Sequence, residues 1–295
     1  MRPNRLAVAA TLVAAALFGT SATSRALAGV ELSAIAVAAG RLFIGALGLV
    51  LIVVFRSGWS ALFRLWRRPW VWLMGLAVAG YQGLFFVGTG LTGVAVGTVA
   101  SLALGPLFAG ALGWTLNRER PSKSWWLATA LAVIGVLSLS FDALQLNSVL
   151  DPLGVLAAIG AGAAYAVYTV LGSRGIKNNE DSTTVLASAF LLGAVFLTPA
   201  LAGAGSSLFT PTAFWLMLWL GLVTTTLAYV LFGLGLRTLS ASSVATLNLA
   251  EPVVATLLGV FILQESLSLT SSFGILLIAV ALSLLAISSM KASSS

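Results

Sequence analysis

The sequence predicts an all-α integral membrane protein: ten transmembrane helices in two inverted five-helix repeats, with both termini in the cytoplasm. Three observations predict this fold: an apolar composition, a one-sided distribution of basic residues, and an internal repeat. Of the 295 residues, 59% are hydrophobic and 8% are charged, and the mean hydropathy is +1.06. A soluble domain of this length needs a polar surface that this composition cannot supply. The chain is therefore expected to cross a membrane several times.

Missing residue types exclude several classes of protein. The chain has no cysteine and no histidine, which excludes disulfides, thiolate catalysis and the usual zinc and haem ligands. It also has no GxxxxGK[ST] sequence, so it carries no ATP-driven motor of its own. We expect no cofactor, no metal and no enzymatic activity, because no paired carboxylates share one face of a helix.

Ten apolar segments are long enough to be membrane helices, which need roughly 20 residues each. They are residues 5–23, 33–55, 70–90, 94–116, 125–141, 152–172, 183–201, 212–236, 242–263 and 270–289. Arg237 and the serines that follow it separate the eighth segment from the ninth.

Basic residues mark one side of the membrane. With the N-terminus placed in the cytoplasm, thirteen Lys and Arg lie in predicted cytoplasmic segments and Arg25 alone lies outside, while Arg41 falls within a helix. This bias follows the positive-inside rule. The net charge of +7 is therefore explained by topology, and we expect no nucleic-acid partner.

The two halves of the chain resemble one another. GALGWTLNRERPS (110–122) follows Pro106, and TLLGVFILQESLS (256–268) follows Pro252. With the two prolines superimposed, the aligned pairs are Ala109 with Ala255, Leu112 with Leu258, Gly113 with Gly259, Glu119 with Glu265, and Ser122 with Ser268.

The repeat divides the chain into residues 1–146 and 147–295, with five helices in each half. Because five is odd, the second copy enters the membrane upside down, as in the inverted repeats of secondary transporters. The first 28 residues also resemble a secretory signal, with Ala26-Leu27-Ala28 as the cleavage site. Cleavage would leave the first repeat one helix short, so we expect this segment to be retained.

These features resemble the EamA-type branch of the drug/metabolite transporter superfamily. In that family each repeat carries a Pro, then a Gly, then a Glu at the helix end before a further helix. AAGRLFIGA (38–46) and LAEPVVATLLGVFILQE (249–265) carry the likeness, which covers nearly the whole chain. Within the superfamily, the overall likeness is greatest to the YddG group of amino-acid exporters. The resemblance implies alternating-access export of neutral amino acids, aromatic ones included, across the bacterial inner membrane.

Arg41 and Glu251 are the two charges that fall well inside the predicted hydrocarbon core. Each costs at least about 2.5–3.5 kcal/mol to insert, which suggests a function. Their predicted depths differ by only about 5 Å in a ~30 Å core. A guanidinium suits the carboxylate of an amino acid, and a carboxylate suits its ammonium group. Two other interpretations stay open: a permanent ion pair between these residues, and a Glu251 that carries the proton coupled to transport.

Polar and aromatic residues in the middle of predicted helices complete the substrate-binding site. With Arg41 and Glu251, the predicted substrate-binding residues are Tyr81, Gln82, Phe85, Tyr165, Tyr168, Tyr229 and Asn248. Packing between helices would explain the aromatic residues equally well. Pro106 and Pro252 are predicted to break their helices and free a backbone carbonyl near the substrate, with a simple packing kink as the alternative.

Alternative functions remain at this stage. One is export of small organic cations or drugs, with Glu251 as the counter-charge, and another is a membrane protein that transports nothing. The predicted partners are an amino acid, the lipid bilayer and a proton, and we expect a monomer.

Overall fold

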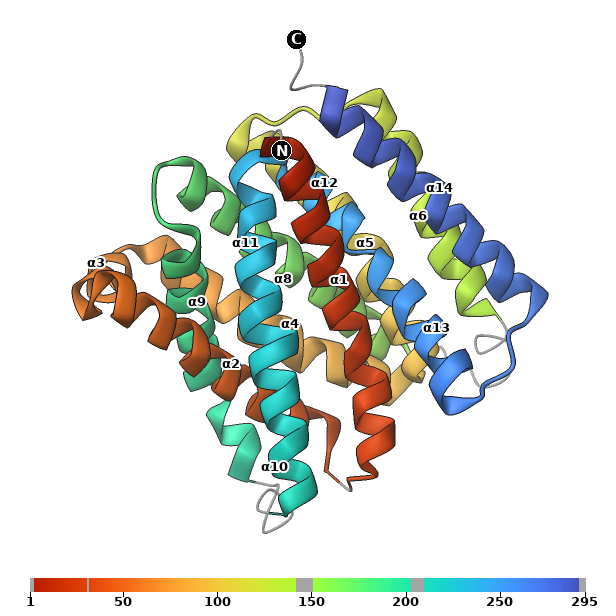
Figure 1. Cartoon of the computed structure of the whole chain (residues 1–295), viewed down its shortest axis with the longest axis horizontal. Coiled ribbons are helices and arrows are strands. Elements are labelled where there is room, and N and C mark those ends of the chain that lie inside the picture. The colour runs from red at the N-terminus through yellow and green to blue at the C-terminus, as the bar shows by residue number, and fades with distance from the viewer. Residues whose placement is uncertain (1–2, 31, 142–150, 203–209, 292–295) are drawn as a thin grey trace.

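The computed structural model of the chain describes residues 3–30, 32–141, 151–202 and 210–291. The regular secondary structure in these residues is entirely helical. The helices form a bundle in which both ends of the chain lie at the same end (Figure 1). There, the Nδ2 group of Asn4 donates a hydrogen bond to the backbone oxygen of Ser289 over 2.9 Å.

The helices of the two halves are as follows. The first half contains α1 (Pro3–Ala28), α2 (Ala34–Ser57), α3 (Trp59–Trp66), α4 (Pro69–Thr92), α5 (Val94–Asn117) and α6 (Lys123–Leu139). The second half contains α8 (Pro152–Lys177), α9 (Ser182–Leu197), α10 (Pro211–Leu218), the π-helix η2 (Trp219–Leu227), α11 (Ala228–Thr238), α12 (Ala241–Leu247), α13 (Ala250–Leu263) and α14 (Leu269–Lys291).

Nine helical segments of the described residues are long and apolar enough to cross a membrane. Two of them combine several elements: Pro211–Thr238 joins α10, η2 and α11, and Ala241–Leu263 joins α12 and α13. The predicted segment 125–141 corresponds to α6, an apolar helix of 17 residues that packs along α14. The count of ten membrane crossings and the cytoplasmic location of the termini therefore stay predictions.

One helix was not predicted from the sequence. Helix α3 lies in the polar interruption between the second and third predicted segments and has eight residues. Ala61, Leu62 and Leu65 face the protein and are buried, whereas Trp59 and Phe63 are more than half exposed. An amphipathic helix of this kind, beside the ends of membrane helices, suits the interface between lipid and water.

Helices α5 and α13 end in the same way, as their aligned sequences suggest. Each is followed by a residue in the left-handed conformation, Arg118 (φ 56°) after α5 and Gln264 (φ 60°) after α13. The next residue in both copies is a glutamate whose N–H donates to the carbonyl of a glycine over 3.1 Å. These pairs are Glu119 with Gly113 and Glu265 with Gly259.

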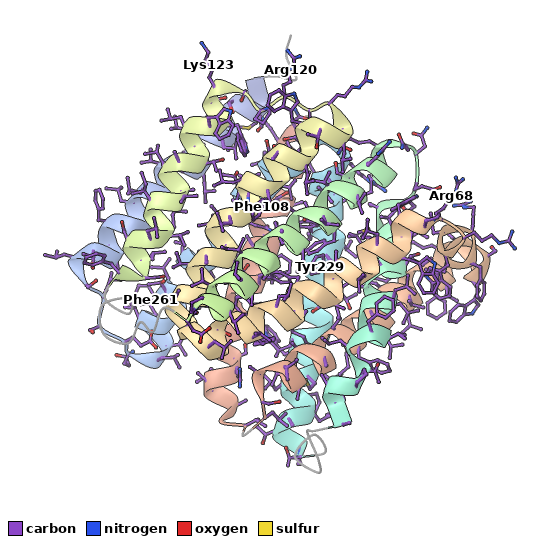
Figure 2. The ribbon with its side chains drawn as sticks, turned by 180° about the vertical axis from the view of Figure 1, so that it is seen from behind. Arg68, Phe108, Arg120, Lys123, Tyr229 and Phe261 are labelled. Atoms are coloured by element: carbon purple, nitrogen blue, oxygen red, sulfur yellow. The ribbon has the colours of Figure 1, made fainter. Side chains whose placement is uncertain are left out.

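Ion pairs join several loops at one end of the bundle. They connect Arg64 with Glu180, Lys177 with Glu119, and Arg237 with Asp181. We call this end, formed by residues 57–68, 118–122, 177–181 and 238–240, the basic end. Figure 2 shows Arg68, Arg120 and Lys123 at the outer edge of the molecule, while Tyr229 lies near its middle.

Packing is tighter on the basic-end side of the segment that contains α12 and α13. Six of the seven residues of α12 are buried, and this helix packs against α5, α6 and α8. Helix α13 packs mainly against α1, with fewer contacts to α14, and Gly259 is its buried residue. This segment is thus more deeply buried near the basic end than at the opposite end.

Candidate functional site

An interruption between α12 and α13 positions Glu251. Helix α12 ends at Leu247 and α13 begins at Ala250, close to the break predicted at Pro252. Proline has no N–H, so Pro252 cannot donate to the carbonyl of Asn248, four residues earlier. The N–H of Glu251 donates to that carbonyl instead, over 2.9 Å. Glu251 therefore lies in the first turn of α13, directly after the interruption.

The break predicted at Pro106 is not observed. Helix α5 continues through Pro106 from Val94 to Asn117, because one missing N–H leaves the hydrogen bonds of the neighbouring turns in place. The carbonyl of Leu102 still lacks the N–H that an α-helix would offer four residues later. Leu102 is one of the residues that line the cavity described next, so a carbonyl without its helical donor belongs to the cavity wall although the helix is not broken.

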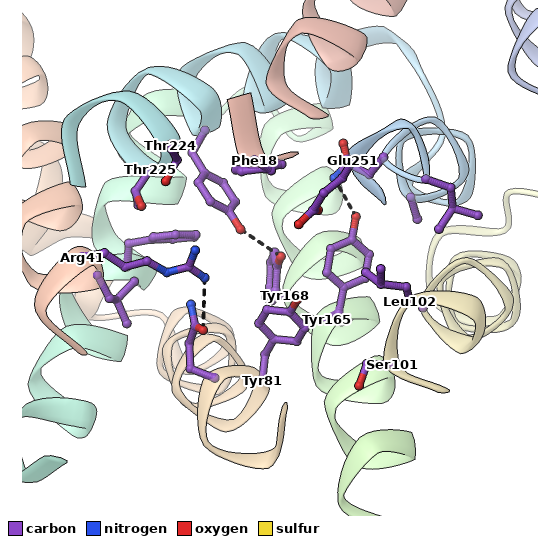
Figure 3. A pocket seen from close by; sticks show the side chains of 18 of the residues that line it. Phe18, Arg41, Tyr81, Ser101, Leu102, Tyr165, Tyr168, Thr224, Thr225 and Glu251 are labelled. Atoms are coloured by element: carbon purple, nitrogen blue, oxygen red, sulfur yellow. Dashed lines mark hydrogen bonds between the residues drawn. The ribbon is translucent and has the colours of Figure 1, made fainter. Parts of the chain in front are cut away.

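A cavity lies among the helices at the level of Glu251, and its walls come from both halves of the chain (Figure 3). Most of the predicted site residues line it, namely Arg41, Tyr81, Gln82, Pro106, Tyr165, Tyr168, Tyr229, Asn248 and Glu251. Phe85 and Pro252 do not line it. The ring of Phe85 packs on Tyr81 at 6.0 Å between centroids, and Pro252 lies in the first turn of α13.

Arg41 and Glu251 stand on opposite sides of the cavity, with tyrosine side chains between them in the view of Figure 3. Nη2 of Arg41 donates to Oε1 of Gln82 on α4 over 3.2 Å. Neither Arg41 nor Glu251 takes part in an ion pair within the described part of the chain. The structure thus presents two opposite charges across a cavity, and the direct ion pair that the sequence left open is not formed.

Asn248 offers a hydrogen-bond acceptor next to Glu251. Its Nδ2 group donates to the hydroxyl of Tyr165 over 3.0 Å. Its Oδ1 atom is buried and accepts no hydrogen bond from the described residues. A buried amide oxygen without a donor is costly, and an ammonium or hydroxyl group of a ligand would satisfy it.

Aromatic rings make up much of the cavity wall. Tyr81 packs on Tyr165 and Tyr168 at centroid distances of 5.9 and 6.2 Å, and the Tyr168 and Tyr229 hydroxyls lie 3.1 Å apart. The free volume is small, about 50 Å³, which is room for roughly four water molecules. A ligand larger than that requires some of these rings to move.

Several residues of the cavity wall were not predicted from the sequence, among them Phe18, Ser101, Phe190, Thr224 and Thr225. The sequence repeat could have indicated Phe18, because it is the counterpart of Tyr165. The two threonines belong to the π-helix η2, and their hydroxyls donate to the carbonyl of Leu220 over 2.8 and 2.9 Å. The cavity wall therefore includes these two hydroxyl-bearing side chains close to Arg41 (Figure 3).

Comparison with known proteins identifies the family. The sequence pattern of the family described as "EamA-like transporter family" matches the chain twice, at residues 5–141 and at residues 152–287. The chain belongs to the EamA-like transporter family. With its apolar helices, this membership makes it a multi-pass protein of the inner membrane.

Similar proteins of this family are named as transporters. The chain is 39% identical to the "Uncharacterized transporter YwfM" of Bacillus subtilis, over 90% of this chain and 88% of that one. It is 29% identical to the "Threonine/homoserine exporter RhtA" of Escherichia coli K12, over 76% of this chain and 72% of that one. A solved structure, titled only "Crystal structure of protein", has a TM-score of 0.80 at 21% identity and covers 97% of this chain and 98% of its own. That likeness shows that the two chains share one fold over nearly their full length.

Proposed function

We propose that this EamA-like transporter exports neutral amino acids, aromatic ones included, by alternating access between two inverted repeats, residues 1–146 and 147–295. One observation carries the proposal: Arg41 and Glu251 face one cavity from opposite sides without forming an ion pair. A zwitterion complements this arrangement, with its carboxylate at Arg41 and its ammonium at Glu251 and the Oδ1 atom of Asn248.

The walls of this cavity indicate which amino-acid side chains it can accept. Ring faces suit apolar and aromatic groups, whereas the tyrosine hydroxyls suit a short polar group. The free volume of about 50 Å³ favours a short side chain such as that of threonine, and the name of the relative RhtA points the same way. In this proposal the tyrosine rings move apart when either amino acid binds, and phenylalanine requires the larger movement.

Glu251 is proposed to carry the coupled proton. Its carboxylate lines the cavity and makes no hydrogen bond to the described residues. Proton relays in transporters are built from acidic side chains of this kind, placed in the membrane and facing a cavity. A proton and the substrate ammonium would bind at Glu251 in turn. This alternation is what a transporter needs when it exports a substrate in exchange for a proton that enters the cell.

Transport in proteoliposomes that contain only this protein tests the proposal. Threonine and phenylalanine counterflow would be measured with and without an imposed pH gradient, for the wild type and for Glu251→Gln. We expect wild-type flux of both amino acids, accelerated by the gradient, and a Glu251→Gln variant that does not respond to it. Normal, gradient-driven flux in Glu251→Gln would remove Glu251 from both roles.

The organic-cation alternative has its own signature in the same assay. A cation needs Glu251 but not Arg41, so Arg41→Gln would leave its transport intact while Glu251→Gln abolishes it. An amino acid needs both residues. If the wild type moves neither amino acid, the zwitterion assignment is wrong and organic cations are the next substrates to test.

A further inference from the structure

A second cavity lies at the basic end, between the start of α4 and the end of α8. Its lining includes Arg68, Trp70, Arg174, Asn178 and Glu180. It shares no lining residue with the cavity around Glu251. Its free volume is about 420 Å³, several times that of the first cavity and within the range of ligand-binding sites.

The charges around this cavity leave it positive. The carboxylate of Glu180 already pairs with Arg64 over 3.2 Å. Arg68 and Arg174 take part in no ion pair within the described residues. Two guanidinium groups without counter-charges on one cavity suit a phosphate, which arginine binds through two parallel hydrogen bonds.

The surroundings of the cavity are those of a membrane interface. The indole of Trp70 packs against Gly175 so closely that a methyl group added there would stand 2.5 Å from its ring. Nearby, Trp72 is half exposed on α4 and Phe63 is half exposed on α3. Exposed aromatic rings beside unpaired arginines at the ends of membrane helices are typical of the headgroup level of a bilayer. Figure 2 shows Arg68 at this edge of the molecule, beside α3.

We propose that this cavity binds the headgroup phosphate of an anionic phospholipid, of the phosphatidylglycerol type, from the leaflet at the basic end. Arg68 and Arg174 hold the phosphate, and Asn178 offers its amide to the glycerol hydroxyls. The acyl chains leave along the exposed apolar residues of α4, among them Trp72, Leu73 and Leu76. Because a free phosphate ion makes no use of this apolar surface, the site favours the lipid.

Native mass spectrometry of the whole purified protein tests this site. Phosphatidylglycerol is titrated into the wild type, into Arg68→Gln/Arg174→Gln, and into the control Arg56→Gln/Arg120→Gln. The control removes the same charge from two exposed arginines that do not line the cavity, Arg120 in the basic end and Arg56 directly before it. We expect about 30-fold weaker phosphatidylglycerol binding in the cavity variant, because each arginine contributes roughly a fivefold change in affinity. The control is expected to lose less than about fivefold.

Two further arms keep the outcome decisive. Phosphatidylcholine should bind the wild type no more tightly than it binds the cavity variant. Inorganic phosphate up to millimolar concentration should not displace phosphatidylglycerol. Equal losses in the two double variants would show a general surface-charge effect and overturn the proposal, as would displacement by inorganic phosphate. Size-exclusion profiles and amino-acid counterflow report whether each variant is folded.

Discussion

Gly19 of α1 lies against the backbone of Glu251, so closely that a methyl group added to Gly19 would stand 2.8 Å from the Glu251 carbonyl oxygen. The same methyl group would stand 2.8 Å from Cβ of Val254. Both contacts are with atoms that cannot rotate away, so the close approach of α1 to the first turn of α13 at this point requires a residue without a side chain. Helix α1 therefore packs directly against the backbone of Glu251 and positions this residue in the bundle.

Gly19→Ala is expected to destabilise the protein by about 1–3 kcal/mol, the usual cost of forcing an extra methyl group into a packed interface. It should also impair transport, because the Glu251 turn must shift to admit the methyl group. Thermal unfolding in detergent and threonine counterflow measure the two effects. Gly83→Ala is the matched control, since a methyl group there meets no atom within 4 Å. It should leave stability unchanged or raise it by up to about 1 kcal/mol, and equal losses in both variants would contradict the packing argument.

The hydrogen bond from Asn248 to Tyr165 supports a second prediction. Tyr165→Phe removes the hydroxyl and leaves the Nδ2 group of Asn248 buried without its acceptor, at a cost of about 1–3 kcal/mol. Adding Asn248→Leu removes both polar partners, so the double variant should recover part of the lost stability. Transport should not recover, because the proposed ammonium acceptor at residue 248 is gone. A double variant that unfolds earlier than Tyr165→Phe would show that this bond does not set the stability.

The membrane helices could be predicted because apolar length is a strong signal, and the described helices overlap all ten predicted segments. The signal fails where packing between distant segments decides the structure. Helix α3 has only eight residues, too few for the apolar length that identifies a membrane helix, and its inner face packs on α2 and α9. The π-helix η2 was missed for a similar reason: Thr226 donates to the carbonyl of Gly45 on α2 over 3.0 Å, a contact that no local pattern contains.

The site was predictable where its residues are chemically unusual for a membrane. Arg41, Glu251 and Asn248 stand out in apolar helices, and all three line the cavity. Aromatic residues do not stand out, because a phenylalanine looks the same in the sequence whether it faces a cavity or a neighbouring helix. This explains why Phe85 was included and Phe190 was not, although Phe190 lines the cavity and Phe85 does not.

Arg41 gives a prediction that separates charge from geometry. Arg41→Gln should lower the transport efficiency for threonine by about 10- to 150-fold, the range expected for losing a hydrogen bond to a charged group. Arg41→Lys keeps the charge but loses the planar fork that binds a carboxylate through two bonds, so an intermediate loss is expected. Arg56→Gln on the same helix, exposed and outside the cavity, should transport normally. Wild-type efficiency in Arg41→Gln would remove this residue from the substrate site.

The last prediction concerns the inverted repeat itself. Arg120 and Ser266 occupy equivalent positions in the aligned copies, two residues before the serines that begin α6 and α14. If the copies are inverted, these equivalent positions face opposite sides of the membrane. The chain has no cysteine, so Arg120→Cys and Ser266→Cys each introduce a single thiol without further substitutions. Both positions are exposed, and twelve basic residues remain on the predicted cytoplasmic side after Arg120→Cys, enough to keep the orientation.

A membrane-impermeant thiol reagent should label Ser266→Cys in intact cells and Arg120→Cys only in inverted membrane vesicles. Labelling of both thiols from the same side would mean that an even number of crossings separates the equivalent positions, which contradicts the inversion of the second copy. Labelling of Arg120→Cys in intact cells and of Ser266→Cys only in inverted vesicles would agree with the inversion. It would show the reverse orientation, with the basic end outside. Labelling of Ser266→Cys from outside and Arg120→Cys from inside would place the basic end, with its ion pairs and its second cavity, in the cytoplasm.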